Sequence, residues 1–549
     1  MLLTAAALIL WSISLLQLSR TGLAADDMGY IHTLPLSFWA AMVSVTIASA
    51  ILWVSPRSHN SLLALQLSLF ITMLWLTPLF LGRTVTSTRY LFGLHQLTVY
   101  IQRYGQLDTL SQWYHNWPAF NLLETAILEL TGIKNPEPLL IWAVGPMQFL
   151  VALTLYVLFR RALGAGNHCW VAVWFYILFN WTAQTYFGPQ GLATVLFLTL
   201  IWFLVMGVTE ASVRPSLRLM AILTITGLTI THLLTSLAGI FVVGAMGVIR
   251  RRPRLPMLVV LFAVLVAAWM LYEATAFFDS DVPLFVKRAL KFDEMWFWNV
   301  TRTYLGSEGH QAVVTIRIWY AVAGGLIGLA GLALSRRIRS PRDDAVLVMA
   351  VGIVVMVPFQ FYGNELFSRG FLFLMPMIAY FAASLLRTRA TALLLALLMV
   401  VAAPFGIIAL HGNALQDDVT PSQRVYWHFL EDKTTHGNLG FGGIPMSWPM
   451  GYADRYTGNF DWIRAFASDW KEKWAIRGWV VWGTNNYVGF TKYEDAGFRM
   501  LTDYPEGVSE LRAKGNEMPD LNLMYDNGEV TAYYHNGEKP TTPYVVDTR

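Results

Sequence analysis

Thirteen apolar stretches, separated by short polar segments, follow one another along the first 410 residues of the chain. Most approach the roughly 20 residues that an α-helix needs to cross a bilayer. The sequence therefore predicts a mainly α fold, a polytopic transmembrane helix bundle of about 13 spans. Two of the stretches, within 217–249, are short for two crossings. The predicted spans are 2–19, 35–54, 61–81, 138–159, 168–187, 190–208, 217–234, 236–249, 255–278, 313–335, 345–362, 370–386 and 390–410.

Arginines gather in alternate short loops between these spans, with 15 basic residues against three acidic ones. Basic loops remain on the cytoplasmic side of a membrane. We therefore expect a multi-pass protein of the plasma (inner) membrane with a cytoplasmic N-terminus. The larger loops, 20–34, 82–137 and 279–312, would then lie outside. The loop arginines are Arg57, Arg160, Arg161, Arg214, Arg218, Arg250, Arg251, Arg252, Arg254, Arg336, Arg337, Arg339, Arg342, Arg387 and Arg389.

The chain divides into a membrane domain, 1–410, and a tail, 411–549, of opposite charge. The first part has 26 basic and 16 acidic residues, a net charge of +10, and the tail has 13 and 19, a net charge of −6. The tail is rich in aromatic residues and includes strand-like pieces at Gly478–Trp482 and Val530–Tyr534. Asn527-Gly528 predicts a hairpin with a type I′ turn. We expect a small extracytoplasmic α/β domain.

The composition of the chain narrows the range of possible functions. Only 13% of the residues are charged, about half the usual share in soluble domains, which argues against a soluble enzyme or a nucleic-acid-binding protein. A single cysteine, Cys169, excludes a disulfide framework. The sequence contains no phosphate-binding G-x-x-x-x-G-K-[ST] run, so an ATP-driven pump is disfavoured. Any chemistry is expected outside the membrane or at its outer leaflet.

Two adjacent carboxylates, Asp26 and Asp27, follow the first span directly. Such a pair can bind a divalent cation, Mg²⁺ or Mn²⁺, or one member can act as a general base toward an acceptor hydroxyl. The alternative is a solvated turn with helix-capping acids. The sequence does not itself require a cation.

The long loop 82–137 offers a second group of polar residues among aromatic ones. Tyr90–Tyr104 has helical spacing, with Tyr90, Leu94, Leu97 and Ile101 on one stripe, and predicts an amphipathic helix at the membrane interface. Its bases would suit lipid phosphates, although simple anchoring in the bilayer explains the same pattern. The candidates here are Arg89, His95, Arg103, Asp108 and His115.

Three further candidates lie near the predicted outer ends of spans. Glu365 and Arg369 are spaced i,i+4 and could pair with each other. Alternatively, Arg369 offers its guanidinium to a phosphate while Glu365 holds it in place. His232 is either a hydrogen-bonding residue in helix packing or a functional side chain.

This layout resembles that of the GT-C superfamily, multi-span glycosyltransferases that use polyprenyl-phosphate sugars. The resemblance rests on the many spans, the acidic pair after the first, the large outside loops and the extracytoplasmic tail. It implies that Asp26 or Asp27 is catalytic. It also implies three partners: a polyprenyl-phosphate-linked sugar, the lipid bilayer, and a glycan, lipid or protein acceptor.

A second resemblance is to bacterial polytopic proteins described as glycosyltransferase-like. Two departures matter: Thr185 stands where members of that group often have an acid, and the first loop is short for a GT-C enzyme. The second departure makes Asp108 a reserve base. The similar stretches are Tyr100–Gly105, His115–Pro118, Gln184–Gln190, Thr231–Thr235, Asn364–Arg369 and Tyr525–Val530.

Three functions follow as hypotheses. In the first, a glycosyltransferase moves a hexosyl or pentosyl group from a polyprenyl-phosphate donor, with Asp26 or Asp27 as the base. Arg89, His95, His232 and Arg369 hold the phosphate, and Glu365, Asp108 and His115 support them. The second is a polymerase or ligase of lipid-linked saccharides that relies on the arginine and histidine residues. The third is a non-enzymatic transporter or scaffold, although we find none of the internal symmetry that is typical of transporters.

Overall fold

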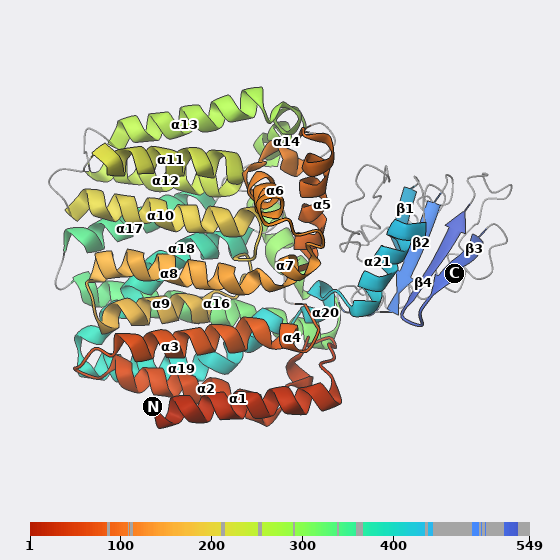
Figure 1. The fold of residues 1–549 in the computed structure, drawn as a ribbon. Helices are drawn as coiled ribbons and strands as arrows, with labels where there is room; N and C mark the ends of the chain where they lie inside the picture. Colours follow the sequence, from red (N-terminus) through yellow and green to blue (C-terminus); the bar gives the residue numbers. More distant parts are fainter. Residues whose placement is uncertain are drawn as a thin grey trace.

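Two groups of helices make up the membrane domain: long helices that lie side by side, and shorter ones that cross one end of that bundle (Figure 1). A computed structural model describes the chain apart from residues 85–87, 108, 110–112, 210–214, 251–254, 289–290, 337–339, 358–365, 434–437, 443–485, 493–495, 497–499, 501–520 and 536–549.

The long helices are α1 (Leu2–Thr21), α2 (Leu36–Trp53), α3 (Asn60–Ile71) continued by η2 (Thr72–Leu76) and α4 (Thr77–Phe80), α8 (Val144–Leu163), α9 (Asn167–Phe179), α10 (Pro189–Thr209), α11 (Pro215–Thr231), α12 (Leu233–Arg250), α13 (Leu255–Tyr272), α16 (Glu308–Ser335), α17 (Pro341–Met356), α18 (Leu366–Ala383) with η9 (Ser384–Arg387), and α19 (Arg389–His411). The shorter elements are η1 (Ile31–Thr33), α5 (Thr88–Tyr104), η3 (Trp113–Asn116), α6 (Ala119–Thr131), α7 (Glu137–Trp142), α14 (Thr275–Arg288), α15 (Phe292–Trp296), η4 (Phe297–Thr301) and η5 (Arg302–Tyr304).

Every predicted apolar stretch falls largely within one of these helices or helix pairs, but the count of thirteen crossings is not confirmed. Among the described residues, eight helices are long and apolar enough to cross a membrane, or nine if α13 and α14, bent by 91°, form one span. Helix α9 has 13 residues, about 20 Å at 1.5 Å per residue. That is shorter than the roughly 30 Å hydrocarbon core of a bilayer.

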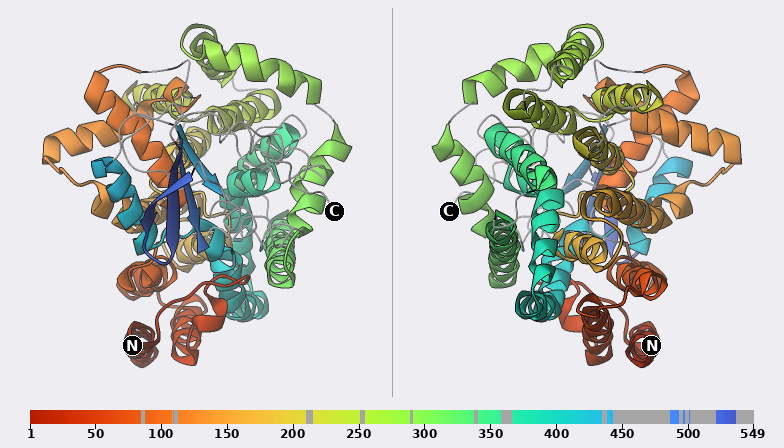
Figure 2. Two further views of the ribbon diagram at one scale, coloured as in Figure 1. Left: turned by 90° about the vertical axis from the view of Figure 1, so that its right-hand side faces the viewer. Right: turned by 90° about the vertical axis from the view of Figure 1, so that its left-hand side faces the viewer.

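The core of the bundle lies around α9, where every residue from Cys169 to Phe179 is buried. A helix that is apolar on all sides is stable only when neighbours surround it. Helices α2, α8, α18 and α19 pack on it. Seen along the bundle, α1 and α2 lie at one rim and α13 at the other (Figure 2).

The tail leaves the bundle at the end that α5, α6 and α14 cross, which we call the tail-side end (Figure 1). Its described parts are α20 (Ala414–Asp417), α21 (Pro421–Lys433), β1 (Asn438–Gly442), β2 (Asn486–Thr491), β3 (Leu521–Asp526) and β4 (Val530–His535). The strands form one sheet in the order β1-β2-β4-β3, with β1 and β2 parallel and the other pairs antiparallel.

The predicted hairpin is confirmed, but its turn type was wrong. Strands β3 and β4 pair antiparallel, and a three-residue loop, 527–529, joins them. Gly528 has φ +84°, whereas Asn527 is not among the described residues with positive φ. A type I′ turn needs positive φ at both central residues. The predicted strand Gly478–Trp482 lies outside the described residues.

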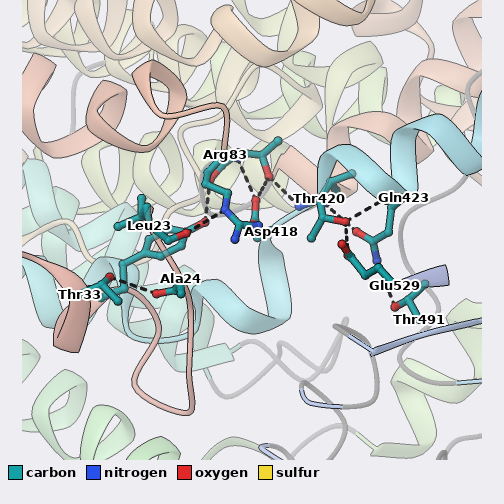
Figure 3. Close-up of polar contacts among 12 residues, drawn as sticks. Leu23, Ala24, Thr33, Arg83, Asp418, Thr420, Gln423, Thr491 and Glu529 are labelled. Atoms are coloured by element: carbon teal, nitrogen blue, oxygen red, sulfur yellow. Dashed lines mark hydrogen bonds and ion pairs between the residues drawn. The ribbon is translucent and has the colours of Figure 1, made fainter. Parts of the chain in front are cut away.

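The tail is attached through a connected set of buried hydrogen bonds (Figure 3). Asp418 accepts hydrogen bonds from the backbone N–H of Thr84 at 2.9 Å and from its hydroxyl at 2.7 Å. Two residues further on, the hydroxyl of Thr420 donates to Glu529 in the hairpin loop at 2.5 Å. The segment between bundle and sheet is therefore anchored on both sides.

Candidate functional site

The first loop brings Asp26 and Asp27 to the tail-side end but gives them different partners. Both oxygens of Asp26 are engaged: Oδ1 accepts from the backbone N–H of Met28 at 2.8 Å, and Oδ2 lies 2.5 Å from Nδ1 of His32. The Asp26 side chain remains 44% exposed. The hydrogen bonds of Asp26 therefore lie within the first loop.

Asp27 reaches across to the beginning of α16. Its Oδ2 accepts a hydrogen bond from the backbone N–H of Gly309 at 3.1 Å. The first N–H groups of a helix have no partner inside it and carry partial positive charge, so a carboxylate is stabilised there. A Cβ on Gly309 would lie 2.4 Å from Oδ2, so only glycine allows this approach. The other oxygen, Oδ1, accepts no hydrogen bond from the described residues.

Several contacts hold the first loop in this position. A Cβ on Gly29, which has φ +66°, would lie 1.8 Å from the carbonyl oxygen of His411 at the end of α19. Gly29 is therefore needed both for its backbone conformation and for this close packing. Arg83 donates from Nε to the carbonyl oxygen of Leu23 at 2.9 Å. The hydroxyl of Thr33 donates to the carbonyl oxygen of Ala24 at 3.1 Å (Figure 3).

Beside Asp27, the first turn of α16 continues into a buried polar pair. His310 is 5% exposed and its Nδ1 lies 3.2 Å from Oδ1 of Asn413. Ser307 caps the same helix by accepting from the backbone N–H of His310. The helix terminus that Asp27 contacts is thus also held by the cap at Ser307 and by the contact between His310 and Asn413.

A second cluster joins the helix beginnings of α10, α12 and α18. Nη1 of Arg369 lies 3.4 Å from Nε2 of His232 and 3.4 Å from Oε1 of Gln190, and both Arg369 and His232 are 8% exposed. Nδ1 of His232 lies 3.1 Å from the hydroxyl of Thr235. A guanidinium can only donate, so Nε2 of His232 accepts and the imidazole is neutral.

The structure therefore brings together two sequence candidates, Arg369 and His232, that are 137 residues apart. It also adds Gln190, which was not among the sequence candidates. A guanidinium beside a neutral imidazole keeps its positive charge, and buried arginines suit phosphate oxygens.

Arg317 was not among the candidates chosen from the sequence, although an arginine within the predicted span 313–335 is a signal for a functional site. It lies on α16, whose N-terminus contacts Asp27, and its Nε donates to the carbonyl oxygen of Ala409 at 2.7 Å. Its guanidinium carbon lies 5.7 Å from the ring centre of Trp181. The Trp181 ring in turn contacts Phe371, two residues from Arg369. Trp181 thus connects α16, whose start contacts Asp27, with α18, which carries Arg369.

Two candidates of the long loop, His95 and His115, are buried beside α5. His95 is 1% exposed and its Nδ1 lies 2.9 Å from Oε1 of Glu124, which is fully buried. His115 is also buried, with Nε2 3.2 Å from the carbonyl oxygen of Leu97. Glu124 was not among the sequence candidates.

The predicted helix 90–104 is confirmed as α5, but its apolar stripe does not face lipid. Leu94, Leu97 and Ile101 are buried, and α5 packs on α6 and η3. Arg103 is exposed. Asp108 and Glu365 lie outside the described residues, as does the side chain of Arg89.

A cation site is not formed by the residues predicted for it. Among the described residues, no three His, Cys, Asp or Glu side chains converge on a point where a metal ion could bind. Asp26 already uses both its oxygens, so we derive no step through a cation.

No protein-family model and no curated protein matches the chain. Among solved structures, the chain is similar to ArnT from Cupriavidus metallidurans bound to undecaprenyl phosphate, with 13% identity over 91% of this chain and 97% of that one, and a TM-score of 0.47. It is similar to the arabinofuranosyltransferase AftD from Mycobacteria, with 13% identity over 94% of this chain and 41% of that one, and a TM-score of 0.46. It is also similar to the Archaeoglobus fulgidus oligosaccharyltransferase tethered with an acceptor peptide, with 13% identity over 90% and 74% of the chains and a TM-score of 0.40.

All three are GT-C glycosyltransferases. Identities of 13% assign no residue role to this chain.

Proposed function

We propose that this protein is an integral membrane glycosyltransferase that moves a sugar from a polyprenyl-phosphate donor to an acceptor on the extracytoplasmic face. One observation carries the proposal: the helix whose start contacts a first-loop carboxylate and the helix that carries Arg369 are joined through Trp181. Asp27 touches the start of α16, Arg317 lies on α16 against Trp181, and Trp181 contacts Phe371 near Arg369.

The reaction needs a base and an anion-binding site. Asp27 Oδ1 removes the proton from the acceptor hydroxyl, whose oxygen then attacks the anomeric carbon of the donor sugar. The bond between that carbon and the phosphate oxygen breaks, and the phosphate leaves with the electron pair. Arg369, assisted by His232 and Gln190, stabilises the negative charge that develops on the phosphate.

Asp27 suits the role of base better than Asp26. The Oδ1 atom of Asp27 has a free lone pair, and its partner oxygen is fixed to Gly309. Both oxygens of Asp26 are occupied by Met28 and His32. Asp26 would then shape the loop, with the exposed His32 as its partner.

Sugar transfer from a labelled polyprenyl-phosphate donor tests the proposal with Asp27→Asn and Asp26→Asn in the full chain. We expect Asp27→Asn to lower kcat by about 100-fold or more, since a general base contributes about 10²–10⁴-fold, and Asp26→Asn to keep most of the activity. Full activity of both variants together with loss in Arg369→Gln would favour the polymerase or ligase hypothesis. Absence of transfer by the wild-type protein with every donor tried would favour a transporter or scaffold.

A further inference from the structure

Glu124 and His95 form a buried carboxylate–imidazole pair that takes no part in the reaction proposed above. His95 is on α5 and Glu124 on α6, and both are at most 1% exposed. Oε2 of Glu124 also accepts from the hydroxyl of Thr98 at 2.5 Å. Asn121 donates to the same hydroxyl at 3.1 Å. These four side chains form a small polar core between two helices, which we call the α5–α6 cluster.

The hydrogen bonds give the two nitrogens of the His95 ring different surroundings. Oε2 of Glu124 accepts from Thr98, and Oε1 faces Nδ1 of His95. The other ring nitrogen, Nε2, lies on the far side of the ring, and it is a second donor when both nitrogens carry a proton.

This second nitrogen has no partner. Nε2 of His95 is buried and makes no hydrogen bond within the described structure, and the same holds for Oδ1 of Asn121. Leaving a buried polar atom unsatisfied costs about 1–3 kcal/mol, more for a charged group. A buried carboxylate–imidazole pair with an unsatisfied ring nitrogen suggests a missing ligand.

The outer surface of α6 indicates what surrounds this pair. Its buried side carries Asn121 and Glu124 beside Phe120 and Leu128, while its outward side exposes Leu122 (45%), Leu123 (42%) and Leu130 (87%). Exposed leucines on one helix face favour contact with lipid chains. Helix α5 packs against α6, so the α5–α6 cluster lies between these two helices.

We propose that His95, oriented by Glu124, binds an oxygen of a phosphate group through Nε2, and that the phosphate belongs to a lipid whose chain lies against α6. The inference takes the polyprenyl character of the lipid from the proposed function; the phosphate chemistry follows from the pair itself. Glu124 is a positioning residue, since it acts through His95.

Binding to the full-length protein in nanodiscs tests this site without turnover. The probe is farnesyl monophosphate, titrated against tryptophan fluorescence, with farnesol and inorganic phosphate as competitors. The informative variant is His95→Asn, because the amide nitrogen of asparagine stands near the position of Nδ1. It keeps a donor for Glu124 and removes Nε2. Glu124→Gln replaces the carboxylate that faces Nδ1 of His95 by a neutral amide.

We expect His95→Asn and Glu124→Gln to weaken farnesyl phosphate binding by about tenfold or more, the effect of one hydrogen bond to a charged group. Glu129→Gln is the matched control, since this carboxylate on the same helix is exposed and accepts a hydrogen bond from Gln102. It should bind like the wild type. Equal competition by inorganic phosphate would support the phosphate site with free phosphate as its source. Equal competition by farnesol would overturn it.

Wild-type affinity in His95→Asn, with its fold intact, would also overturn the proposal, because a purely structural pair retains its Nδ1-side hydrogen bond in that variant. The same titration in an Arg369→Gln background separates this site from the arginine cluster. If His95→Asn still weakens binding in the Arg369→Gln background while Asp27→Asn retains transfer activity, the phosphate site at His95 is supported and the catalytic role of Asp27 is refuted. If His95→Asn binds farnesyl phosphate normally and Asp27→Asn is inactive, the phosphate site is refuted and the catalytic role of Asp27 is supported.

Discussion

Nη1 of Arg83 lies 3.2 Å from Oδ2 of Asp418, although 335 residues separate them in the sequence. The same guanidinium donates through Nε to Leu23 in the first loop, and the Asp418 side chain is fully buried. One arginine therefore joins the segment that carries Asp27 to the segment that carries the tail (Figure 3). Movement of the tail is expected to reach the first loop through this residue.

Substitution of Asp418 by Asn should loosen the tail. The carboxylate accepts from Thr84 twice and from Arg83, and breaking a buried ion pair costs about 3–5 kcal/mol. We expect faster protease cleavage near 418–420 and a lower thermal unfolding temperature. Arg83→Lys should give an intermediate loss, since an ammonium group cannot make both directed contacts. Unchanged cleavage in Asp418→Asn would contradict this role.

Substitution of Gly309 by Ala should abolish most transfer activity while leaving the bundle folded. The new Cβ would lie 2.4 Å from Asp27 Oδ2, so the carboxylate must leave the helix terminus. Gly325→Ala, on the same helix with nothing within 4 Å of its Cβ, is the control. It should keep full activity and gain helix stability of up to about 1 kcal/mol. Equal kcat values for the two variants would refute the contact between Asp27 and Gly309 as a catalytic requirement.

Gly331 is expected to be needed for the packing of α16 on α18. A Cβ there would lie 1.9 Å from the backbone carbonyl oxygen of Phe381, and small residues allow such close helix crossings in membranes. Gly331→Ala should lower the unfolding temperature and the yield of monodisperse protein, measured by fluorescence-detected chromatography during heating. The Gly325→Ala variant again serves as the reference, and similar melting of both would show that the crossing adapts at little cost.

Removal of divalent cations should have little effect on transfer. Asp26 uses both carboxylate oxygens in contacts to Met28 and His32, and Asp27 uses one at Gly309, so three of the four oxygens of the pair already have partners. We expect less than a twofold change in kcat/KM after treatment with excess EDTA. Loss of activity that Mg²⁺ or Mn²⁺ restores would show that the first loop rearranges around a cation.

Substitution of Trp181 should weaken donor binding by the arginine residues more than it lowers the stability of the fold. Its ring lies against both Arg317 and Phe371, and a cation over an indole is stabilised by about 0.5–2 kcal/mol. We expect Trp181→Leu to raise KM for the donor several-fold with a smaller change in kcat, and Trp181→Phe to recover part of that loss. A change in kcat alone would instead favour a role in the chemical step.

The sequence by itself determined the helical stretches, the hairpin of the tail and most of the side chains worth testing. Apolar runs and arginine-rich loops are local patterns, and local patterns determine where a helix begins and ends. Where the helices differ from the predicted spans, the reason is local as well. The turn after Phe179 shortens one predicted span, and the break between Tyr272 and Thr275 bends another. The apolar stripe of 90–104 did predict α5, but a stripe that packs on protein looks the same in sequence as one that packs on lipid.

Only the tertiary structure decided which of these side chains meet. Arg369 contacts His232 rather than standing alone, Asp27 faces Gly309, and Glu124 holds His95. These contacts depend on the angles and offsets at which helices pack, and a single sequence carries no record of them. Charges in a membrane protein are costly unless they are paired or functional, so the sequence could select the residues, whereas packing alone could assign their partners.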